Sequence, residues 1–439
     1  MPEEQAVLDA LSQIIDPDFQ RDIVSLGFIK EMVIREGHVA FSIELTTPAC
    51  PIKDRFREEA ERLVGAVPGV TKVSVTMTAR ERPKRQLEEG SGLDKVRTII
   101  AISSCKGGVG KSTVAAMLAR NIAARGHKTG LLDTDIFGPS VPTLFNLHQE
   151  GVAGQGDYML PVEADGLKIM SFGFMIGDKP AVMRGPMVSN YLQHLLHHVA
   201  WGELDYLVID LPPGTGDIQL TLSQSIQIDA AVIVTTPHQL SLTDVRKGIL
   251  MFDKVNVPVI GVIENMAYFI CDGCDKRHEI FGGGGAGELE QRFGLKQLAE
   301  LPISTSMSGS LAAISDSAAA QEATDAVIRA VGAQALARNE KPAVAFDAAQ
   351  ITLTWPDGET VTVANRALRL ACACANCVDE MSSRPTLDPD TVPMDIHAKE
   401  VWTIGNYAIG VNWSDGHATG FFPYHTLREM VGAPAKARR

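Results

Sequence analysis

Long apolar runs alternate with helical patterns through the middle of the chain. Five runs rich in β-branched residues have the length of buried strands: TIIAIS (98–103), KTGLLD (128–133), DYLVIDL (205–211), AAVIVTT (230–236) and PVIGVIEN (258–265). Continuous runs of this kind are typical of parallel strands whose two faces are both covered by helices. The pattern therefore predicts an α/β fold with a doubly wound, mostly parallel sheet, and it places ligands at the carboxyl ends of the strands.

The beginning of the chain has a different pattern. Amphipathic helices are predicted over residues 6–16 and 52–67, and strand-like runs occupy 38–45 and 70–77. We interpret this part as a small α+β domain. The end of the chain instead carries short strands around Asp-Gly turn signals, which predicts a small, mostly β domain.

Two charged or polar segments, residues 79–95 and 337–343, separate these parts. Both have the composition of solvated linkers. The predicted domains are therefore 1–82, 95–338 and 346–439, and a chain of 439 residues has room for all three.

Composition and charge exclude several classes of protein. The formal net charge of −13 argues against nucleic acid as a partner, because sequence-blind binding to nucleic acid needs a basic surface. There is no apolar run long enough to span a membrane, and no secretion signal is evident, so we expect a cytoplasmic protein. Five of the 7 cysteines fall in two tight clusters, which favours metal binding over disulfides in that compartment.

The segment SSCKGGVGKSTV (103–114) lies between a predicted strand and a predicted helix, which is the context that a phosphate-binding P-loop requires. Its glycines let backbone N–H groups surround an anion, and the following helix adds its positive end. Lys111 would reach the β- and γ-phosphates of ATP, and Ser112 would hold Mg²⁺. The predicted nucleotide-binding residues here are Cys105, Lys106, Gly107, Gly108, Val109, Gly110, Lys111, Ser112 and Thr113.

The second lysine of this loop, Lys106, is either a solvated side chain or the mark of a particular class. The loop resembles the deviant P-loop of the MinD/ParA/nitrogenase-iron-protein superfamily, in which the early lysine reaches the nucleotide of a partner subunit. That resemblance implies a homodimer and a catalytic role for Lys106 and Lys111. It also implies that Asn265 contacts adenine, although a turn-forming asparagine after a strand would look the same.

Aspartates follow two of the predicted strands. Asp135 is positioned to orient the attacking water, Asp133 to hold a metal-bound water, and Asp210 to support Mg²⁺ from a second shell. The segment 212–216 has the character of a switch that senses the γ-phosphate. Asp217 either closes that switch or caps the next helix.

Cys271 and Cys274 form a C-x2-C pair. Two thiolates are too few for a tetrahedral metal site, but two copies of the chain supply four, which suits a [4Fe–4S] cluster or zinc. A thioredoxin-like redox pair and a structural pair without metal are the alternatives.

The motifs CKGGVGKST, DTDIFGPSVP, DLPPGTGD and ENMAYF, followed by C-x2-C and IFGGGGA, together resemble the Mrp/ApbC/Nbp35 family of iron–sulfur cluster carrier ATPases. Cys105 departs from that pattern, since the family has glycine there. The resemblance implies a weak ATPase whose homodimer assembles a cluster on Cys271 and Cys274. It would work with assembly factors and pass the cluster to apoproteins under the control of ATP.

The segment ELTTPACPIKDRF (44–56) is similar to the SufT/PaaD-like domain that accompanies iron–sulfur assembly. Within it, Cys50 precedes a predicted helix, whose dipole lowers a thiol pKa. Cys50 is therefore either a reactive thiol or transient ligand, or else a buried inert thiol.

Cys372, Cys374 and Cys377 need a fourth ligand for a closed site, and His417 is the first choice over His397 and His425. This part is similar to the N-terminal domain of γ-butyrobetaine hydroxylase, which implies a Cys3His site for Zn²⁺; a second cluster site is the alternative. Hydroxylase activity is not implied.

Two other functions use related machinery. A MinD/ParA-like positioning protein also dimerises on ATP, but it needs a membrane-targeting tail or a basic DNA-binding face and gives the C-x2-C pair no role. A reductase resembling the nitrogenase iron protein would carry single, widely spaced cluster cysteines, and this chain does not.

Overall fold

The computed structural model describes residues 2–47, 49–79, 91–176, 185–214, 217–237, 242–271, 273–274, 276–282, 285–303, 310–337, 341–374, 376–378 and 384–432. The chain divides into two compact units: Met1–Arg85 with Thr324–Leu336, and Gln86–Ala323 with Ala337–Arg439. Parts of the predicted linkers and of the predicted switch lie outside the described residues. The predicted domain boundaries at 82 and 338 lie outside them as well.

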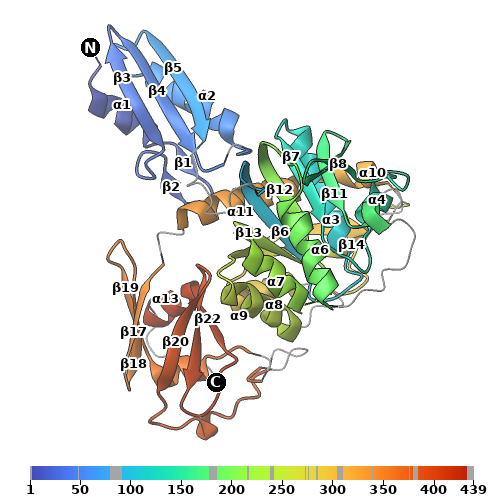
Figure 1. Ribbon diagram of the computed structural model, residues 1–439. Coiled ribbons are helices and arrows are strands. Elements are labelled where there is room, and N and C mark those ends of the chain that lie inside the picture. The colour runs from blue at the N-terminus through green and yellow to red at the C-terminus, as the bar shows by residue number, and fades with distance from the viewer. Residues whose placement is uncertain are drawn as a thin grey trace. The chain divides into compact units, whose positions relative to one another are not determined.

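The second unit is built on a sheet in which nine strands are described, in the order β10-β11-β7-β12-β6-β13-β14-β15, with β16 also paired to β14 (Figure 1). The strands are β6 (Val96–Ser103), β7 (Thr129–Asp133), β10 (Val162–Ala164), β11 (Leu167–Ser171), β12 (Leu204–Asp210), β13 (Ala230–Thr235), β14 (Val259–Ile270), β15 (Arg277–His278) and β16 (Gln297–Ile303). All pairings are parallel except those of β10 and β15. The predicted doubly wound, mostly parallel sheet is confirmed, and its five predicted strands correspond to β6, β7, β12, β13 and β14.

Helices cover both faces of this sheet. The helices that lie entirely in this unit are α3 (Lys111–Ala124), α4 (Val141–Leu144), α5 (Gly173–Ile176), α6 (Gly185–His197), α7 (Asp217–Ser225), α8 (Leu242–Lys254), α9 (Gly285–Phe293) and α10 (Leu311–Ser315), whereas most of α11 (Ala318–Ala337) belongs to the first unit. On β6, Ile99 and Ala101 join one core cluster with Leu192 of α6 and Ile249 of α8. Side chains alternate between the faces of a strand, so the opposite face is left to α3, which packs on β6, β7 and β12.

The order of the strands places the P-loop at a switch in topology. From β6 the chain first goes to β7 and β11 on one side, returns to β12, and then crosses to β13 and β14 on the other side. Doubly wound sheets bind ligands at the carboxyl ends of strands where the connections diverge in this way. The loop after β6 occupies that position.

The first unit contains a three-stranded sheet in the order β3-β4-β5, antiparallel between β3 and β4 and parallel between β4 and β5. Its elements are α1 (Glu4–Leu11), β1 (Ile15–Asp16), β2 (Arg21–Asp22), β3 (Ile29–Arg35), β4 (His38–Leu45), α2 (Lys53–Gly65) and β5 (Lys72–Ala79). The α+β prediction is confirmed. The part of α11 that belongs to this unit packs Leu336 against its core.

The last part of the chain carries two three-stranded antiparallel sheets, β17-β18-β19 and β20-β21-β22, as its β-rich pattern predicts. A smaller hairpin, β8-β9, lies within the second unit. The remaining elements are β8 (Ala153–Gln155), β9 (Tyr158–Leu160), β17 (Ala343–Phe346), β18 (Gln350–Thr354), β19 (Thr360–Ala364), α12 (Asn365–Leu370), β20 (Ala398–Ile404), β21 (Ala408–Trp413), β22 (Phe421–Pro423) and α13 (Tyr424–Gly432). Across the described ranges, no helix combines the length and the apolar character that crossing a bilayer requires.

Candidate nucleotide and metal sites

Glycines shape the loop between β6 and α3. Gly108 and Gly110 have φ angles of 81° and 83°, in the left-handed region that other residues seldom adopt. A Cβ at Gly110 would also lie 2.3 Å from Nδ2 of Asn265, so that amide would have to move. The helix begins at the next residue, Lys111, so backbone N–H groups of the loop and helix are available together for an anion.

Lys111 is paired with a buried carboxylate. Its Nζ donates to Oδ1 of Asp210 at 2.5 Å and to Oγ of Ser112 at 3.3 Å. The side chains of Lys111 and Asp210 are only 6% and 0% exposed. The ammonium and the hydroxyl are therefore held together at the carboxyl end of β12, where a phosphate and its Mg²⁺ would need them.

Asp133 and Asp210 are partners across the sheet, at the ends of β7 and β12. Both are buried, and Asp133 accepts hydrogen bonds from Asp135 N, Val141 N and Ser171 Oγ. Burial, reinforced by the charge of Asp210, raises the pKa of Asp133 to about 7. Burial also raises the pKa of Asp210, although Lys111 opposes that effect. Asp133 thus stabilises the turn after β7 through hydrogen bonds with its backbone. Its predicted role toward a metal-bound water remains a prediction.

Asp135 is less enclosed than Asp133. Its side chain is half-buried, and Oδ1 accepts a hydrogen bond from Gly138 N at 3.2 Å. A carboxylate with access to the site suits the predicted role of Asp135 toward the attacking water better than a fully buried one does.

The two residues at the start of the loop have different surroundings. Lys106 is exposed, and its carbonyl oxygen accepts a hydrogen bond from Ser104 Oγ at 2.9 Å. Cys105 is half-buried and packs against α8, where a Cβ added to Gly248 would lie 3.0 Å from its Sγ. The cysteine that departs from the family pattern thus takes part in helix packing, while Lys106 is accessible.

Asn265 connects β14 to the P-loop. Its Nδ2 donates to the Val109 carbonyl oxygen at 2.9 Å. The backbone turns sharply at the next residue, Met266, which has a φ angle of 56°. The predicted contact of Asn265 with adenine stays a prediction, but its side chain does lie against the loop that would hold the nucleotide.

The same strand runs directly into the C-x2-C pair. Beyond Ile270 the chain turns back at Cys271 and Cys274 and returns as β15, with Cys271 N donating to Lys276 O at 3.0 Å. Cys274 is exposed and Cys271 is half-buried. Large apolar side chains around this hairpin are also exposed, including Ile280 at 57% and Phe281 at 41%. Accessible thiols with an apolar rim suit a contact with another protein.

The structure brings together the three C-terminal cysteines and the predicted fourth ligand. Nε2 of His417 lies 3.3, 3.5 and 3.8 Å from Sγ of Cys372, Cys374 and Cys377. All three thiols are buried, and the hydrogen bonds of His417 with Cys374 and Cys377 raise the pKa of His417 to about 9. Three thiols and one imidazole converging on one point fit the donor set of a structural zinc ion. His397 and His425 are not in this cluster of described residues.

Residues that the sequence analysis did not identify hold this cluster in place. Arg369 donates through Nε to Asp415 Oδ2 at 2.9 Å and through NH1 to Cys377 Sγ at 3.5 Å. Asp415 in turn accepts a hydrogen bond from His417 N. Gly420 is required by packing, because a Cβ there would lie 2.6 Å from Sγ of Cys372. Arg369 and Asp415 carried no signal in one sequence, since their pairing depends on the fold.

One arginine of α8 and one of α9 bind the loops that carry these ligands. Arg292 of α9 donates to the carbonyl oxygen of Ala373 at 2.9 Å, and Arg246 of α8 donates to that of Ala418 at 3.2 Å. Phe293 and Phe421 pack edge to face between the same elements, with ring centroids 5.4 Å apart. The C-terminal β-rich part is therefore packed on α8 and α9, within the second unit.

Comparison with known proteins identifies the family of each part of the chain. Residues 95–335, more than half of the chain, match the family described as NUBPL iron-transfer P-loop NTPase. The chain belongs to this family. Residues 4–75 match an iron–sulfur cluster assembly protein family, and residues 344–428 match the γ-butyrobetaine hydroxylase-like N-terminal family. The three resemblances drawn from the sequence are confirmed.

Two relatives with known names agree with this assignment to the iron-transfer family. The chain is 44% identical over 441 residues to "Fe-S cluster assembly factor HCF101, chloroplastic" of Oryza sativa subsp. japonica, covering 97% of this chain and 82% of that protein. It is 44% identical over 304 residues to "Iron-sulfur cluster carrier protein" of Synechocystis sp., covering 68% and 86%. A solved nucleotide-binding protein from Archaeoglobus fulgidus, in complex with ADP, is 40% identical with a TM-score of 0.44, covering 54% and 89%.

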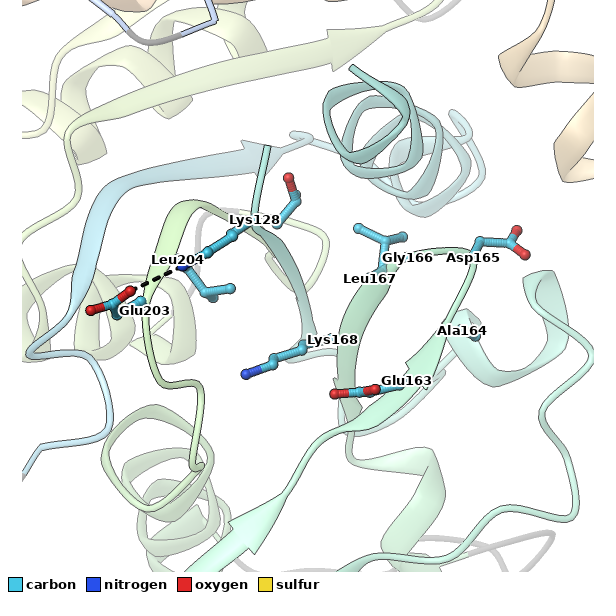
Figure 2. A pocket seen from close by; sticks show the side chains of 10 residues that line it. Lys128, Glu163, Ala164, Asp165, Gly166, Leu167, Lys168, Glu203 and Leu204 are labelled. Atoms are coloured by element: carbon cyan, nitrogen blue, oxygen red, sulfur yellow. Dashed lines mark hydrogen bonds and ion pairs between the residues drawn. The ribbon is translucent and has the colours of Figure 1, made fainter. Parts of the chain in front are cut away.

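The family core has a cavity at the edge of the sheet opposite the P-loop. This cavity, of about 630 Å³, lies at the amino ends of β7 and β12 beside the β10–β11 turn (Figure 2). Three of the charged side chains around it have partners: Lys128 Nζ binds Glu203 at 3.0 Å, Lys168 Nζ donates to Trp201 O at 2.7 Å, and Asp165 accepts from Arg120 at 3.2 Å. The P-loop and Asp133 and Asp210 lie at the opposite edge of the sheet, at the carboxyl ends of β6, β7 and β12.

Cys50, in the assembly-type domain, fits the second of its two predicted alternatives, a buried inert thiol. The following helix would lower its pKa, but burial has the larger effect and raises the pKa of Cys50 to about 11. The nearby carboxylates of Asp16 and Asp18 act in the same direction. In the free protein Cys50 is therefore mostly a protonated, weakly nucleophilic thiol.

Glu264 is expected to make the stability of the family core depend on pH. Its side chain is 2% exposed, and Oε1 has no hydrogen-bond partner in the described part of the chain. Burial, with the charges of Glu300 and Glu279, raises its pKa to about 7. The folded state then binds the proton more tightly than the unfolded state, so stability falls as pH rises from about 4.5 to 7.

Glu264→Gln is therefore expected to flatten this loss of stability. The variant should gain on the wild type as pH rises from 5 to 8, by about 2–3 kcal/mol in the free energy of unfolding. Urea denaturation at the two pH values measures the difference. Glu150→Gln, at an exposed position, is the matched control and should behave as the wild type. If Glu264→Gln and the wild type have the same free energy of unfolding at both pH values, the raised pKa of Glu264 would be contradicted.

Proposed function

We propose that this protein binds an iron–sulfur cluster and passes it to apoproteins, and that ATP controls a homodimer which bridges the cluster. The observation that carries the proposal is the path of β14. One residue of this strand, Asn265, binds the P-loop at Val109, and the strand ends directly before the accessible thiol of Cys271. Nucleotide and cargo would therefore act on the two ends of one short segment.

Each chain supplies two thiols, so four thiolates for a [4Fe–4S] cluster require two copies. The exposed apolar rim around the hairpin, which includes Ile280 and Phe281, supports such a contact. The same arrangement would bring Lys106 of one copy toward the nucleotide of the other.

Hydrolysis would be slow in a single copy and would be completed across the dimer. Lys111 and Ser112 would hold the phosphates and Mg²⁺, with Asp210 behind them, and Asp135 would orient the water. If Asn265 binds adenine, its side chain would give up the hydrogen bond to the Val109 carbonyl oxygen. Nucleotide binding would thereby change the contacts that hold β14 against the P-loop. We propose this weak ATPase as the control of cluster handover.

The C-terminal cluster would hold Zn²⁺ as a structural ion. Cys372, Cys374, Cys377 and His417 fit that ion, and the buried setting suits a closed site without an open position. Recipient apoproteins and assembly factors are the proposed partners, and the cytosol is the proposed compartment. A MinD/ParA-like positioning role has less support, because it assigns no function to the thiols of Cys271 and Cys274.

Anaerobic reconstitution with iron and sulfide tests the cargo. The wild type is expected to take up both elements and to develop a broad absorbance in the blue. Cys271→Ser/Cys274→Ser should lose this absorbance, because it lacks the thiolates. Cys50→Ser, which changes a thiol of the other unit, is the matched control and should keep it. Equal iron and sulfide contents in the wild type and the double variant would overturn the proposal.

A further inference from the structure

The hairpin at the end of β14 brings a third metal-binding side chain to the two thiols. The ligand atoms of Cys271, Cys274 and His278 all lie within 4.8 Å of one another. His278 is exposed, as is Cys274, so both are accessible to an ion from solvent. The motif analysis used only the cysteine pair and did not consider the histidine as a ligand.

The register of the hairpin explains why His278 is on the side of the thiols. His278 is paired across the strands with Phe269, which lies two residues before Cys271. Residues two apart in a strand share a face, and cross-strand partners share a face as well. Cys271 follows the last residue of β14, and the pairing continues to it because its N–H donates to Lys276 O at 3.0 Å. His278 and Cys271 therefore belong to the same face of the hairpin.

The opposite face is held by a different set of contacts. Arg277, the residue before His278, is paired with Ile270 and donates to Glu300 at 2.6 Å. Its guanidinium also lies over the ring of Tyr268, 4.0 Å from the centroid. These contacts fix the returning strand, and with it the face on which His278 stands.

The spacing of the three ligand atoms fits one ion better than the corners of a cluster. Around a tetrahedral ion with metal–sulfur bonds of about 2.3 Å, neighbouring ligand atoms are about 3.5–3.8 Å apart. Separations of no more than 4.8 Å reach that geometry with small side-chain movements. Thiolates that bind different irons of a cluster are held farther apart, since the cluster itself lies between them.

We propose that Cys271, Cys274 and His278 of a single subunit bind one divalent metal ion of the Zn²⁺, Co²⁺ or Fe²⁺ class, with His278 as the third protein ligand. Three protein ligands leave one tetrahedral position open. The single chain would thus hold a mononuclear ion before or after a second copy completes a cluster. This inference uses the same thiols as the proposed function but does not require sulfide or a dimer.

Titration of the full-length, reduced, anaerobic protein with Co²⁺ alone tests the site, because Co²⁺ absorbs visible light when bound by thiolates. Two binding sites are expected, and Cys271→Ser/Cys274→Ser identifies the one at the hairpin by removing it. His278→Ala should weaken that site by at least about tenfold, which is what loss of even an outer partner of a metal site costs. His148→Ala, at another exposed histidine, is the matched control and should change neither site.

His278→Cys separates a ligand from a bystander. As a ligand, the new thiolate should restore tight binding and add thiolate-to-cobalt charge-transfer absorption, which a merely structural role would not do. Wild-type affinity and an unchanged spectrum in both His278 variants would overturn this inference while leaving the cargo proposal intact. Weakened Co²⁺ binding in His278→Ala, together with normal uptake of iron and sulfide by the double cysteine variant, would support this inference and overturn the cargo proposal.

Discussion

Lys106→Ala is expected to lower ATP hydrolysis on the order of 10³-fold while leaving nucleotide affinity and stability close to those of the wild type. Lys106 is exposed in the single chain, so its removal leaves the buried core unchanged. A cation supplied across a subunit contact acts mainly on the charge of the transition state, and such residues contribute about 10³–10⁵-fold in related phosphoryl transfers.

Lys111→Ala provides the contrast. It should abolish tight nucleotide binding, and it should also destabilise the protein by about 3–5 kcal/mol, because it leaves Asp210 buried without its partner. Single-turnover hydrolysis, equilibrium nucleotide binding and urea denaturation on the three proteins separate the roles. Normal hydrolysis in Lys106→Ala would show that this lysine is a solvated loop residue.

Removing the proposed Zn²⁺ from the C-terminal Cys3His cluster is expected to unfold the part of the chain around it. The three cysteines are members of its buried core, next to Trp413 and Phe422. Without an ion, buried thiols and a histidine with a raised pKa must share protons in an apolar setting. Structural zinc contributes about 10–16 kcal/mol of apparent binding free energy in small domains, so we expect a loss of several kcal/mol here.

Tryptophan fluorescence measures this unfolding selectively. The chain has 4 tryptophans, and Trp355, Trp402 and Trp413 all belong to the C-terminal part. A strong chelator, or Cys377→Ala, should shift their emission to the red, whereas Cys105→Ala should not. A chelated, demonstrably metal-free protein with unchanged emission and thermal unfolding would contradict a structural ion at this site.

Much of the fold follows from local patterns, and the exceptions have physical causes. The five apolar runs became β6, β7, β12, β13 and β14 because strands buried on both faces leave little choice of residue. Strand β3 was not predicted, since its positions are half-buried or exposed and its sequence lacks an apolar run. A strand whose side chains are mostly exposed carries a weaker signal than a strand buried on both faces.

In the site as well, features set by local sequence could be predicted and features set by tertiary packing could not. The glycines and lysines of the P-loop are fixed by local backbone geometry and could be identified from the sequence. The enclosure of Asp133 and the raised pKa of Cys50 depend on what packs over them, which local patterns do not encode. The hydrogen bonds of Arg246 and Arg292 with the ligand loops join segments far apart in the chain, so no spacing rule could predict them.

Cluster transfer between purified proteins tests the central claim most directly. The full-length protein is reconstituted with iron and sulfide under anaerobic conditions, freed of unbound iron, and mixed with an apo iron–sulfur enzyme whose activity depends on its cluster. We predict that the acceptor gains its cluster spectrum and activity from the wild type and from Cys50→Ser, but not from Cys271→Ser/Cys274→Ser. An acceptor that stays inactive with the loaded wild type, or that is activated equally by the double variant, would contradict the account.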